Sequence, residues 1–144
     1  LLQQIKGNFP YEPTEEQEIT IKFFVDFLFS PKSESVLLLK GYAGTGKTTL
    51  ISALVKTIRH IRSKCVLLAP TGRAAKVFAQ NASHPAYTIH KKIYRQKTFS
   101  NEMDNFQLAP NLHRDTLFIV DEASMIANED LLALPLEQDG CWMI

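Results

Sequence analysis

The sequence predicts an α/β fold in which a parallel sheet is covered by helices on both faces. Short continuous apolar runs at 36–40, 65–69, 116–120 and 141–144 have the length and composition of strands that are buried on both sides. Segments with apolar residues at helical spacing separate most of these runs, as parallel strands require. The first run also leads straight into a glycine-rich loop, an arrangement typical of a buried strand that opens into a helix.

Length and composition indicate one globular domain. The chain has 144 residues, of which 45% are hydrophobic and 22% charged, and no apolar run approaches the ~20 residues that cross a membrane. The N-terminal residues lack the basic start and long apolar centre of a signal peptide, so we expect a cytoplasmic location. Cys65 and Cys141 both lie in apolar runs, where we expect them to pack as small hydrophobic side chains rather than form a disulfide framework or a zinc site.

The N-terminal region predicts an irregular lead-in followed by a helix. Residues 1–13 contain one glycine and two prolines, which interrupt regular structure. The next four residues have the form of a capping box, with Thr14 as N-cap and Gln17 three positions later, and apolar residues then recur at helical spacing over 14–29. Gln17 has a second interpretation, since its amide could hydrogen-bond an adenine edge, and capping alone explains it about as well.

A phosphate-binding loop follows the first apolar run. Residues 41–49 fit the pattern G-x-x-x-x-G-K-[ST], in which glycines let successive N–H groups turn inward around phosphates. Lys47 adds a positive charge and Thr48 a hydroxyl for Mg²⁺. The alternative is a glycine-rich turn that happens to precede a lysine. We expect the phosphates of a nucleotide to be bound by Gly41, Ala43, Gly44, Thr45, Gly46, Lys47, Thr48 and Thr49.

The next elements complete a strand and two helices. Residues 48–62 predict a helix whose N-terminus points at the phosphates. The run 65–69 predicts a buried strand, and a helix then reaches about Asn81. Thr71 and Arg73 therefore lie at the carboxyl end of a strand, where open α/β sheets bind ligands.

Beyond this helix the pattern is weaker. Residues 81–87 are expected to form a loop, and 88–95 a short basic helix that Thr88 caps. Residues 106–108 fit one arm of a hairpin, and a weak helix is predicted over 129–134.

Two acidic residues follow the third apolar run. Asp121 and Glu122 come directly after 116–120, and in a chain with a phosphate loop they are the expected metal and water partners of that loop. Asp121 would hold Mg²⁺ together with Thr48, and Glu122 would polarise the attacking water, which makes Lys47, Asp121 and Glu122 the predicted catalytic residues. The alternative is a solvated turn. No arginine is placed to reach the γ-phosphate from a second wall, so we expect slow hydrolysis.

The charges are strongly segregated along the chain. Between Ser35 and Asn101 there is no Asp or Glu, and twelve of the sixteen Lys and Arg residues lie there, so this acid-free segment carries +12. The flanks hold four basic and fifteen acidic residues, a net −11. The pattern indicates a surface for polyanions, first nucleotide phosphates and then a nucleic-acid backbone. The alternative is that the basic residues are scattered over separate solvated helix faces.

Four segments in this order resemble motifs I, Ia, Ib and II of superfamily 1 DNA helicases, most closely the RecD-like group. They are residues 41–49, 68–75, 88–90 and 119–124. Thr14 to Gln17 is similar to the Q motif of these enzymes, which favours the adenine role of Gln17. The resemblance implies a RecA-like P-loop NTPase fold, ATP and Mg²⁺ as cofactors, and a motor that couples ATP hydrolysis to movement on single-stranded DNA.

The same resemblance implies a path for single-stranded DNA. The acid-free segment that holds this path also contains aromatic residues that could stack on bases or belong to the core, and His90 could instead pack at a helix start. RecD-like proteins are usually 5′→3′ translocases or helicase subunits of exonucleases, so single-stranded DNA and helicase–nuclease subunits are the implied partners. The residues on the path would be Pro70, Thr71, Arg73, Thr88 and His90, and the aromatic residues that lie among them are Phe78, Tyr87, Tyr94 and Phe99.

The C-terminal end departs from the helicase pattern. A helicase of this kind continues into a Gly-Asp-x-x-Gln motif and a second RecA-like domain that carries arginine fingers, and neither occurs in these 144 residues. We therefore expect residues 1–144 to be most of a first motor domain, with a sheet that is incomplete at its C-terminus and no unwinding activity alone. Two alternatives are a P-loop ATPase or kinase that does not act on DNA, and a non-catalytic nucleotide- or DNA-binding module.

Overall fold

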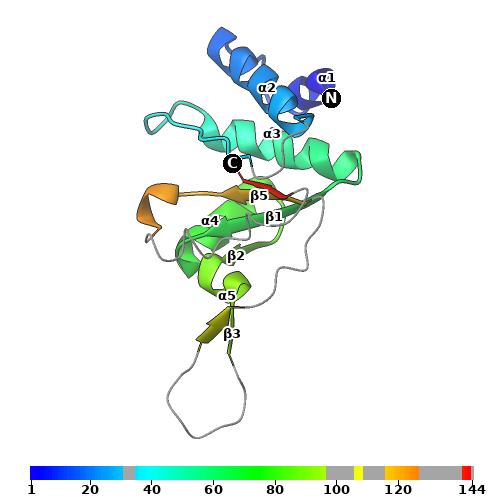
Figure 1. Cartoon of the computed structure of the whole chain (residues 1–144). Helices are drawn as coiled ribbons and strands as arrows, with labels where there is room; N and C mark the ends of the chain where they lie inside the picture. Colours follow the sequence, from blue (N-terminus) through cyan, green and yellow to red (C-terminus); the bar gives the residue numbers. More distant parts are fainter. Residues whose placement is uncertain (31–34, 97–105, 109–115, 127–140, 144) are drawn as a thin grey trace, which may run out of the picture.

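A four-stranded parallel sheet forms the centre of the molecule (Figure 1). The structure, a computed structural model, describes residues 1–30, 35–96, 106–108, 116–126 and 141–143. In the strand order of the sheet, its members are β2 (Ala86–Thr88), β1 (Lys64–Ala69), β5 (Thr116–Val120) and β6 (Cys141–Met143). The helices are α1 (Leu2–Gly7), α2 (Glu15–Leu28), α3 (Lys47–His60), α4 (Gly72–Ala82) and α5 (Ile89–Ile93), with a 3₁₀ turn η1 (Ala123–Met125) after β5.

Both faces of the sheet are buried, which confirms the predicted α/β fold. Leu67 and Ile119 are paired in register and belong to the hydrophobic core that α3 and α4 cover. Their neighbours Leu68 and Phe118 point to the opposite face, because side chains alternate along a strand, and they are only 1% and 5% exposed. Strands buried on both faces account for the continuous apolar runs in the sequence.

Helix α3 lies between the sheet and the N-terminal helices (Figure 1). Its predicted apolar face is buried, including Leu50, Leu54 and Ile58. Burial of each such side chain contributes about 1.5–3 kcal/mol. The helix that begins at the phosphate loop is thereby fixed to the sheet. None of the helices in the described part of the chain has the length and apolar character needed to span a bilayer.

The predicted irregular lead-in over 1–13 is wrong for its first half. Residues Leu2–Gly7 form helix α1, and Ile5 is completely buried in the core. Asn8, just after this helix, donates a 2.9 Å hydrogen bond from Nδ2 to Oγ1 of Thr57 on α3. A six-residue helix without a side-chain cap gives almost no periodic signal, and packing against α3 rather than local propensity stabilises it.

The predicted strand over 36–40 is also wrong. The structure has only an isolated bridge at Val36, and this segment does not join the four-stranded sheet. Leu37 and Leu39 pack against the core, whereas Val36 and Leu38 are 53% and 62% exposed. The apolar run indicated burial correctly for one side of the segment, but hydrophobicity alone does not determine which backbone groups pair.

Most of the remaining predictions agree with the structure. The predicted helices 14–29 and 48–62 and the helix reaching about Asn81 correspond to α2, α3 and α4. The short helix predicted over 88–95 is correct only in part, because α5 ends at Ile93 and Tyr94 and Arg95 belong to strand β3 (Tyr94–Gln96). The proposed hairpin arm pairs antiparallel, as β4 (Phe106–Leu108), with β3, which projects away from the sheet in Figure 1. Strand β2 was missed, because 81–87 was expected to be a loop. The predicted helix over 129–134 lies outside the described residues.

Candidate nucleotide-binding site

One cavity of about 610 Å³ brings the two predicted halves of the site together. It opens between the start of α3 and the carboxyl end of β5. The phosphate loop contributes Gly41, Lys47 and Thr48 to its wall, and the segment after β5 contributes Asp121 and Glu122. Ligand pockets commonly have volumes of about 300–1,000 Å³, so the cavity is large enough for the phosphate part of a nucleotide.

The loop backbone needs its glycines. Gly44 and Gly46 have φ angles of +82° and +83°, in the left-handed region that a side chain disfavours. At Gly41 the limit is space, because a Cβ would lie 2.8 Å from Oγ1 of Thr45. That hydroxyl donates a 2.8 Å hydrogen bond to the carbonyl of Tyr42 and closes the turn. This conformation argues against an accidental glycine-rich turn.

Lys47 is the first residue of α3, and its ammonium group folds back over the loop. It donates hydrogen bonds to the carbonyl oxygens of Gly41 and Tyr42, the second with a length of 2.7 Å. The positive charge therefore lies within the loop, beside the start of a 14-residue helix whose N-terminus favours anions. The two carbonyls act as acceptors in the way that phosphate oxygens would.

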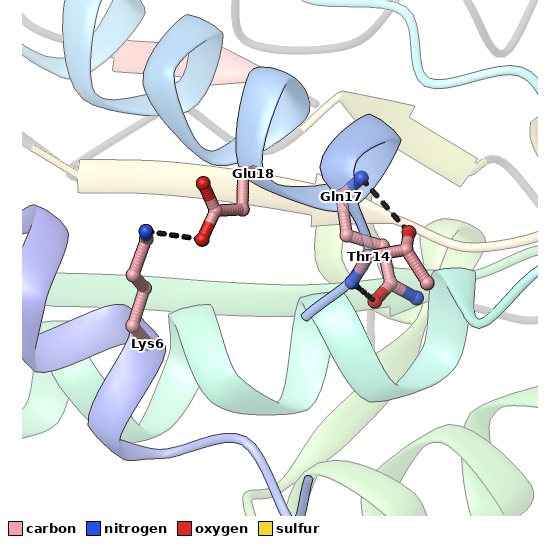
Figure 2. Close-up of polar contacts among 4 residues, drawn as sticks. All are labelled: Lys6, Thr14, Gln17 and Glu18. Atoms are coloured by element: carbon pink, nitrogen blue, oxygen red, sulfur yellow. Dashed lines mark hydrogen bonds and ion pairs between the residues drawn. The ribbon is translucent and has the colours of Figure 1, made fainter. Parts of the chain in front are cut away.

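Gln17 takes part in helix capping and also contacts the phosphate loop. Figure 2 shows the capping box: Oγ1 of Thr14 accepts from the backbone N–H of Gln17, and Oε1 of Gln17 accepts from that of Thr14 at 3.0 Å. On its other side, Nε2 of Gln17 donates to the carbonyl of Thr45 at 3.5 Å. The capping role is confirmed, and the adenine role stays a prediction for a side chain that lies at the loop.

The N-terminal helices hold Gln17 in this position. Lys6 of α1 forms an ion pair with Glu18, the residue after Gln17, as Figure 2 shows. The neighbouring ammonium, which also donates a hydrogen bond, lowers the pKa of the Glu18 carboxyl. Tyr11 was not singled out from the sequence, yet its hydroxyl lies 3.7 Å from where a Cβ on Gly46 would be. An aromatic residue shortly before a capping box was the only signal for it.

The two acidic residues follow β5 in a defined turn. The N–H of Asp121 donates a 3.0 Å bond to the carbonyl of Leu68 and extends the pairing with β1. Oδ1 of Asp121 accepts from the N–H of Glu122 at 3.0 Å. Glu122 has φ +53°, a left-handed conformation that costs a non-glycine residue about 1–2 kcal/mol. Backbone strain of this kind is concentrated at functional sites.

The donor atoms in the cavity fit a magnesium ion. Mg²⁺ prefers oxygen ligands and is usually held by one or two protein groups together with phosphates and water. Thr48 and Asp121 both line this cavity and supply a hydroxyl and a carboxylate. Within the described residues there is no cluster of three or more His, Cys, Asp or Glu side chains. Ser124 also lines the cavity, and the sequence reasoning gave it no role.

The residues predicted for a DNA path lie at one edge of the sheet. Strands β1 and β2 are parallel, with Ala69 paired with Thr88, so the segments after both strands leave the sheet at the same edge. The hydroxyls of Thr71 and Thr88 accept from the N–H groups of Ala74 and Lys91, at 3.1 and 3.3 Å, and cap α4 and α5. The side chains of Thr71, Arg73 and His90 are exposed, and those of Pro70 and Thr88 are half-buried.

Cys65 packs as predicted and lies away from this site. Its sulfur is 3.7 Å from Nε2 of His84. Burial raises the pKa of the Cys65 thiol above its ordinary 9.0, against a smaller opposite effect of Arg59. The thiol is therefore protonated at neutral pH and behaves as a small hydrophobic group.

The fold and the cavity define a P-loop α/β nucleotide-binding domain. Similarity to known proteins supports a superfamily 1 helicase-like type. The chain belongs to the AAA domain family, which it matches over residues 27–137. It is 27% identical over 138 residues to the multifunctional conjugation protein TraI of Escherichia coli (strain K12), which covers 91% of this chain and 7% of TraI. It is 31% identical over 100 residues to the ATP-dependent RecD2 DNA helicase of Deinococcus radiodurans, covering 69% of this chain and 13% of that protein. The chain thus spans only a small part of these relatives.

Proposed function

We propose that this chain is the first, RecA-like motor domain of a RecD-like, ATP-dependent DNA helicase, in which ATP hydrolysis drives movement on single-stranded DNA. The observation that carries the nucleotide part is that Lys47 and Thr48 line the same cavity as Asp121 and Glu122. These are the groups that bind phosphates, hold a metal and orient water in phosphoryl transfer. The similarity to a protein named as a RecD2 DNA helicase supports the DNA part.

In the proposed mechanism the residues of the chain position the reactants. Lys47 exchanges the carbonyls of Gly41 and Tyr42 for oxygens of the β- and γ-phosphates, and the loop N–H groups bind the same phosphates. Thr48 and Asp121 would hold Mg²⁺, which when bound neutralises phosphate charge. Glu122 accepts a proton from the attacking water and keeps it in line.

The DNA path in this proposal crosses the carboxyl edge of β1 and β2. The acid-free segment 35–101 supplies the positive charge, and Arg73 and His90 present exposed side chains at that edge. Translocation needs a second motor domain that closes on ATP, so directional movement belongs to an assembly with that domain and, where present, helicase–nuclease subunits.

Two measurements test the proposal. Binding of a fluorescent oligo(dT) is expected to weaken as salt increases, with a log–log slope of about −0.7 for each neutralised phosphate. ATP turnover, measured with and without the same oligonucleotide, is expected to be slow and to depend on DNA. A P-loop ATPase that does not act on DNA would instead show turnover indifferent to DNA and no salt-dependent binding. ATP binding with no turnover under either condition would identify a non-catalytic module.

A further inference from the structure

The four aromatic residues of the acid-free segment that the sequence offered as base-stacking partners are not equivalent in the structure. Phe78 is 3% exposed and belongs to the hydrophobic core, so it is not accessible to a base. Tyr87 is 38% exposed. Phe99 and the side chain of Tyr94 lie outside what the structure describes. Of the two whose side chains are described, Tyr87 alone can meet a ligand from solvent.

Tyr87 also lies at the edge where the DNA path is proposed. It pairs with Leu68 in the parallel ladder of β1 and β2, and the next pair is Ala69 with Thr88. The ring is thus one residue before Thr88 and beside the end of the strand that leads into Pro70. Because β2 is the edge strand and β1 separates it from β5, Tyr87 is held apart from the carboxylates of Asp121 and Glu122.

A cation accompanies the ring. The ammonium nitrogen of Lys92, on α5, lies 4.6 Å from the centroid of the Tyr87 ring. A cation within about 6 Å of a ring face is attracted to it, so this contact restrains the ring without burying it. Thr88 caps the same short helix through the N–H of Lys91, which fixes the backbone between ring and cation.

From this geometry we infer that Tyr87 and Lys92 form a binding subsite for one nucleotide of single-stranded DNA, in which the ring stacks on a base and the ammonium neutralises the adjoining phosphate. The inference deepens the proposed function and depends on it. Proteins that bind single strands without sequence preference combine these two elements, an aromatic platform and a basic backbone track. The subsite is expected to accept any base, since the contact uses a π-face and a charge.

The test measures fluorescence anisotropy of two labelled oligonucleotides of equal length, oligo(dT) and an abasic strand with the same phosphates. Tyr87→Ala is expected to weaken oligo(dT) binding about 5- to 150-fold, which is about 1–3 kcal/mol per stacked base at tenfold per 1.4 kcal/mol. The same variant is expected to bind the abasic strand like the parent chain. Tyr87→Phe, which keeps the ring, is expected to retain oligo(dT) binding.

Lys92→Ala provides the second arm. Removing this one cation from the binding site is expected to reduce the slope of log binding constant against log salt concentration by about 0.7, for oligo(dT) and for the abasic strand alike. Tyr87→Ala is expected to leave this slope unchanged. Phe23→Ala and Lys22→Ala are the matched controls, because both side chains are exposed on α2, outside the acid-free segment. Both are expected to leave binding to either strand unaltered.

The outcomes separate the two proposals. If the parent chain binds no single-stranded DNA, the proposed function fails together with the subsite. The subsite is refuted, and the proposed function stands, if the parent chain binds DNA and Tyr87→Ala binds oligo(dT) with the same affinity. The same conclusion follows if Tyr87→Ala loses equal affinity for oligo(dT) and for the abasic strand. Thermal unfolding and Mg-ATP binding of each variant show whether it is folded, and the ratio between the two strands is independent of the folded fraction.

Discussion

The ammonium group of Lys47 donates a 2.7 Å hydrogen bond to the carbonyl of Tyr42, five residues earlier in the same loop. Together with its bond to Gly41, this contact closes the phosphate loop around its own lysine. Phosphate oxygens attract the ammonium more strongly than carbonyl oxygens do, because a phosphate carries an opposite charge and adds Coulomb attraction to the hydrogen bond. When a nucleotide binds, the Lys47 ammonium is therefore expected to exchange its hydrogen bonds to the two carbonyls for bonds to phosphate oxygens. The loop is then no longer closed by its own lysine.

Lys47→Ala is accordingly expected to weaken Mg-ATP binding and abolish turnover. The loss of a hydrogen-bonding cation from a phosphate corresponds to about 1.5–3 kcal/mol, or about 10- to 150-fold in affinity. Isothermal titration gives the affinity and phosphate release gives the rate. Lys56→Ala, an exposed lysine further along α3, is the control and is expected to change neither. Turnover that survives in Lys47→Ala would come from a contaminating ATPase.

Gly46→Ala is expected to be more harmful than Gly44→Ala. Both residues have a positive φ, so each substitution introduces about 1–2 kcal/mol of backbone strain. A Cβ at Gly46 would in addition lie 2.5 Å from Nε2 of Gln17, whereas a Cβ at Gly44 meets nothing within 4 Å. The loss of stability and of ATP affinity in Gly46→Ala, minus the loss in Gly44→Ala, therefore measures the cost of displacing the Gln17 side chain.

A double-mutant cycle isolates that contact. Gly46→Ala is expected to lose more stability than Gly44→Ala, and adding Gln17→Ala to Gly46→Ala is expected to remove this additional loss. The backbone strain that both glycine substitutions introduce is expected to remain. Chemical denaturation of the single and double variants gives the coupling. Equal effects of the two glycine substitutions would show that Gln17 moves aside freely and that its position against the loop is not restrained.

Glu122 is expected to show a conflict between stability and activity. Its left-handed φ of +53° favours glycine, so Glu122→Gly should be more stable than Glu122→Ala by up to about 1 kcal/mol, after the greater flexibility of glycine in the unfolded chain is subtracted. Both variants, and Glu122→Gln, should bind Mg-ATP but lose turnover. Thermal unfolding and phosphate release check the two parts, and an alanine variant as stable as the glycine variant would rule out strain at this position.

The sequence was sufficient where local chemistry determines structure. The capping box of Thr14 and Gln17 and the glycines of the phosphate loop are specified by residues only a few positions apart. Lys47 and Asp121 are far apart in the chain, but their motifs assigned both to one site, and they line one cavity even though the strand predicted before Lys47 does not form.

The sequence was insufficient where long-range packing determines structure. Helix α1 depends on the burial of Ile5 against α3, and strand β2 is three residues long and exists because β1 offers an edge. At 36–40 an apolar run indicated a strand whose backbone does not pair with the sheet, since hydrophobicity reports burial and not hydrogen bonding. The bond of Lys47 to its own loop was likewise not predictable, because it depends on the path of the whole loop.

Thr14→Ala is expected to destabilise the domain through the loss of a helix cap. The cap hydrogen bond is typically associated with about 0.5–2 kcal/mol, which lowers the melting temperature by about 2–4 °C per kcal/mol in a domain of roughly this size. Thr20→Ala is the control, because its hydroxyl bonds only the carbonyl of Glu16 within the same helix. Since the cap also orients Gln17 at the loop, the Thr14 variant alone should lose ATP affinity. Equal ATP affinities of the Thr14→Ala and Thr20→Ala variants would show that the helix cap does not contribute to nucleotide binding.

Cys65 is expected to make stability fall at alkaline pH. Burial raises the pKa of its thiol in the folded chain above the 9.0 of an ordinary cysteine, so between these two values the folded state binds more protons than the unfolded state. The contribution of the protonated Cys65 thiol to the free energy of unfolding is therefore complete below pH 9.0. It is lost as the pH rises through the pKa of the thiol in the folded chain. In a Cys141→Ser background, where Cys65 is the remaining thiol, the free energy of unfolding from urea titrations should decrease above this pH. Adding Cys65→Ala should flatten that part of the curve, and identical alkaline slopes with and without the thiol would show that its proton is not linked to folding.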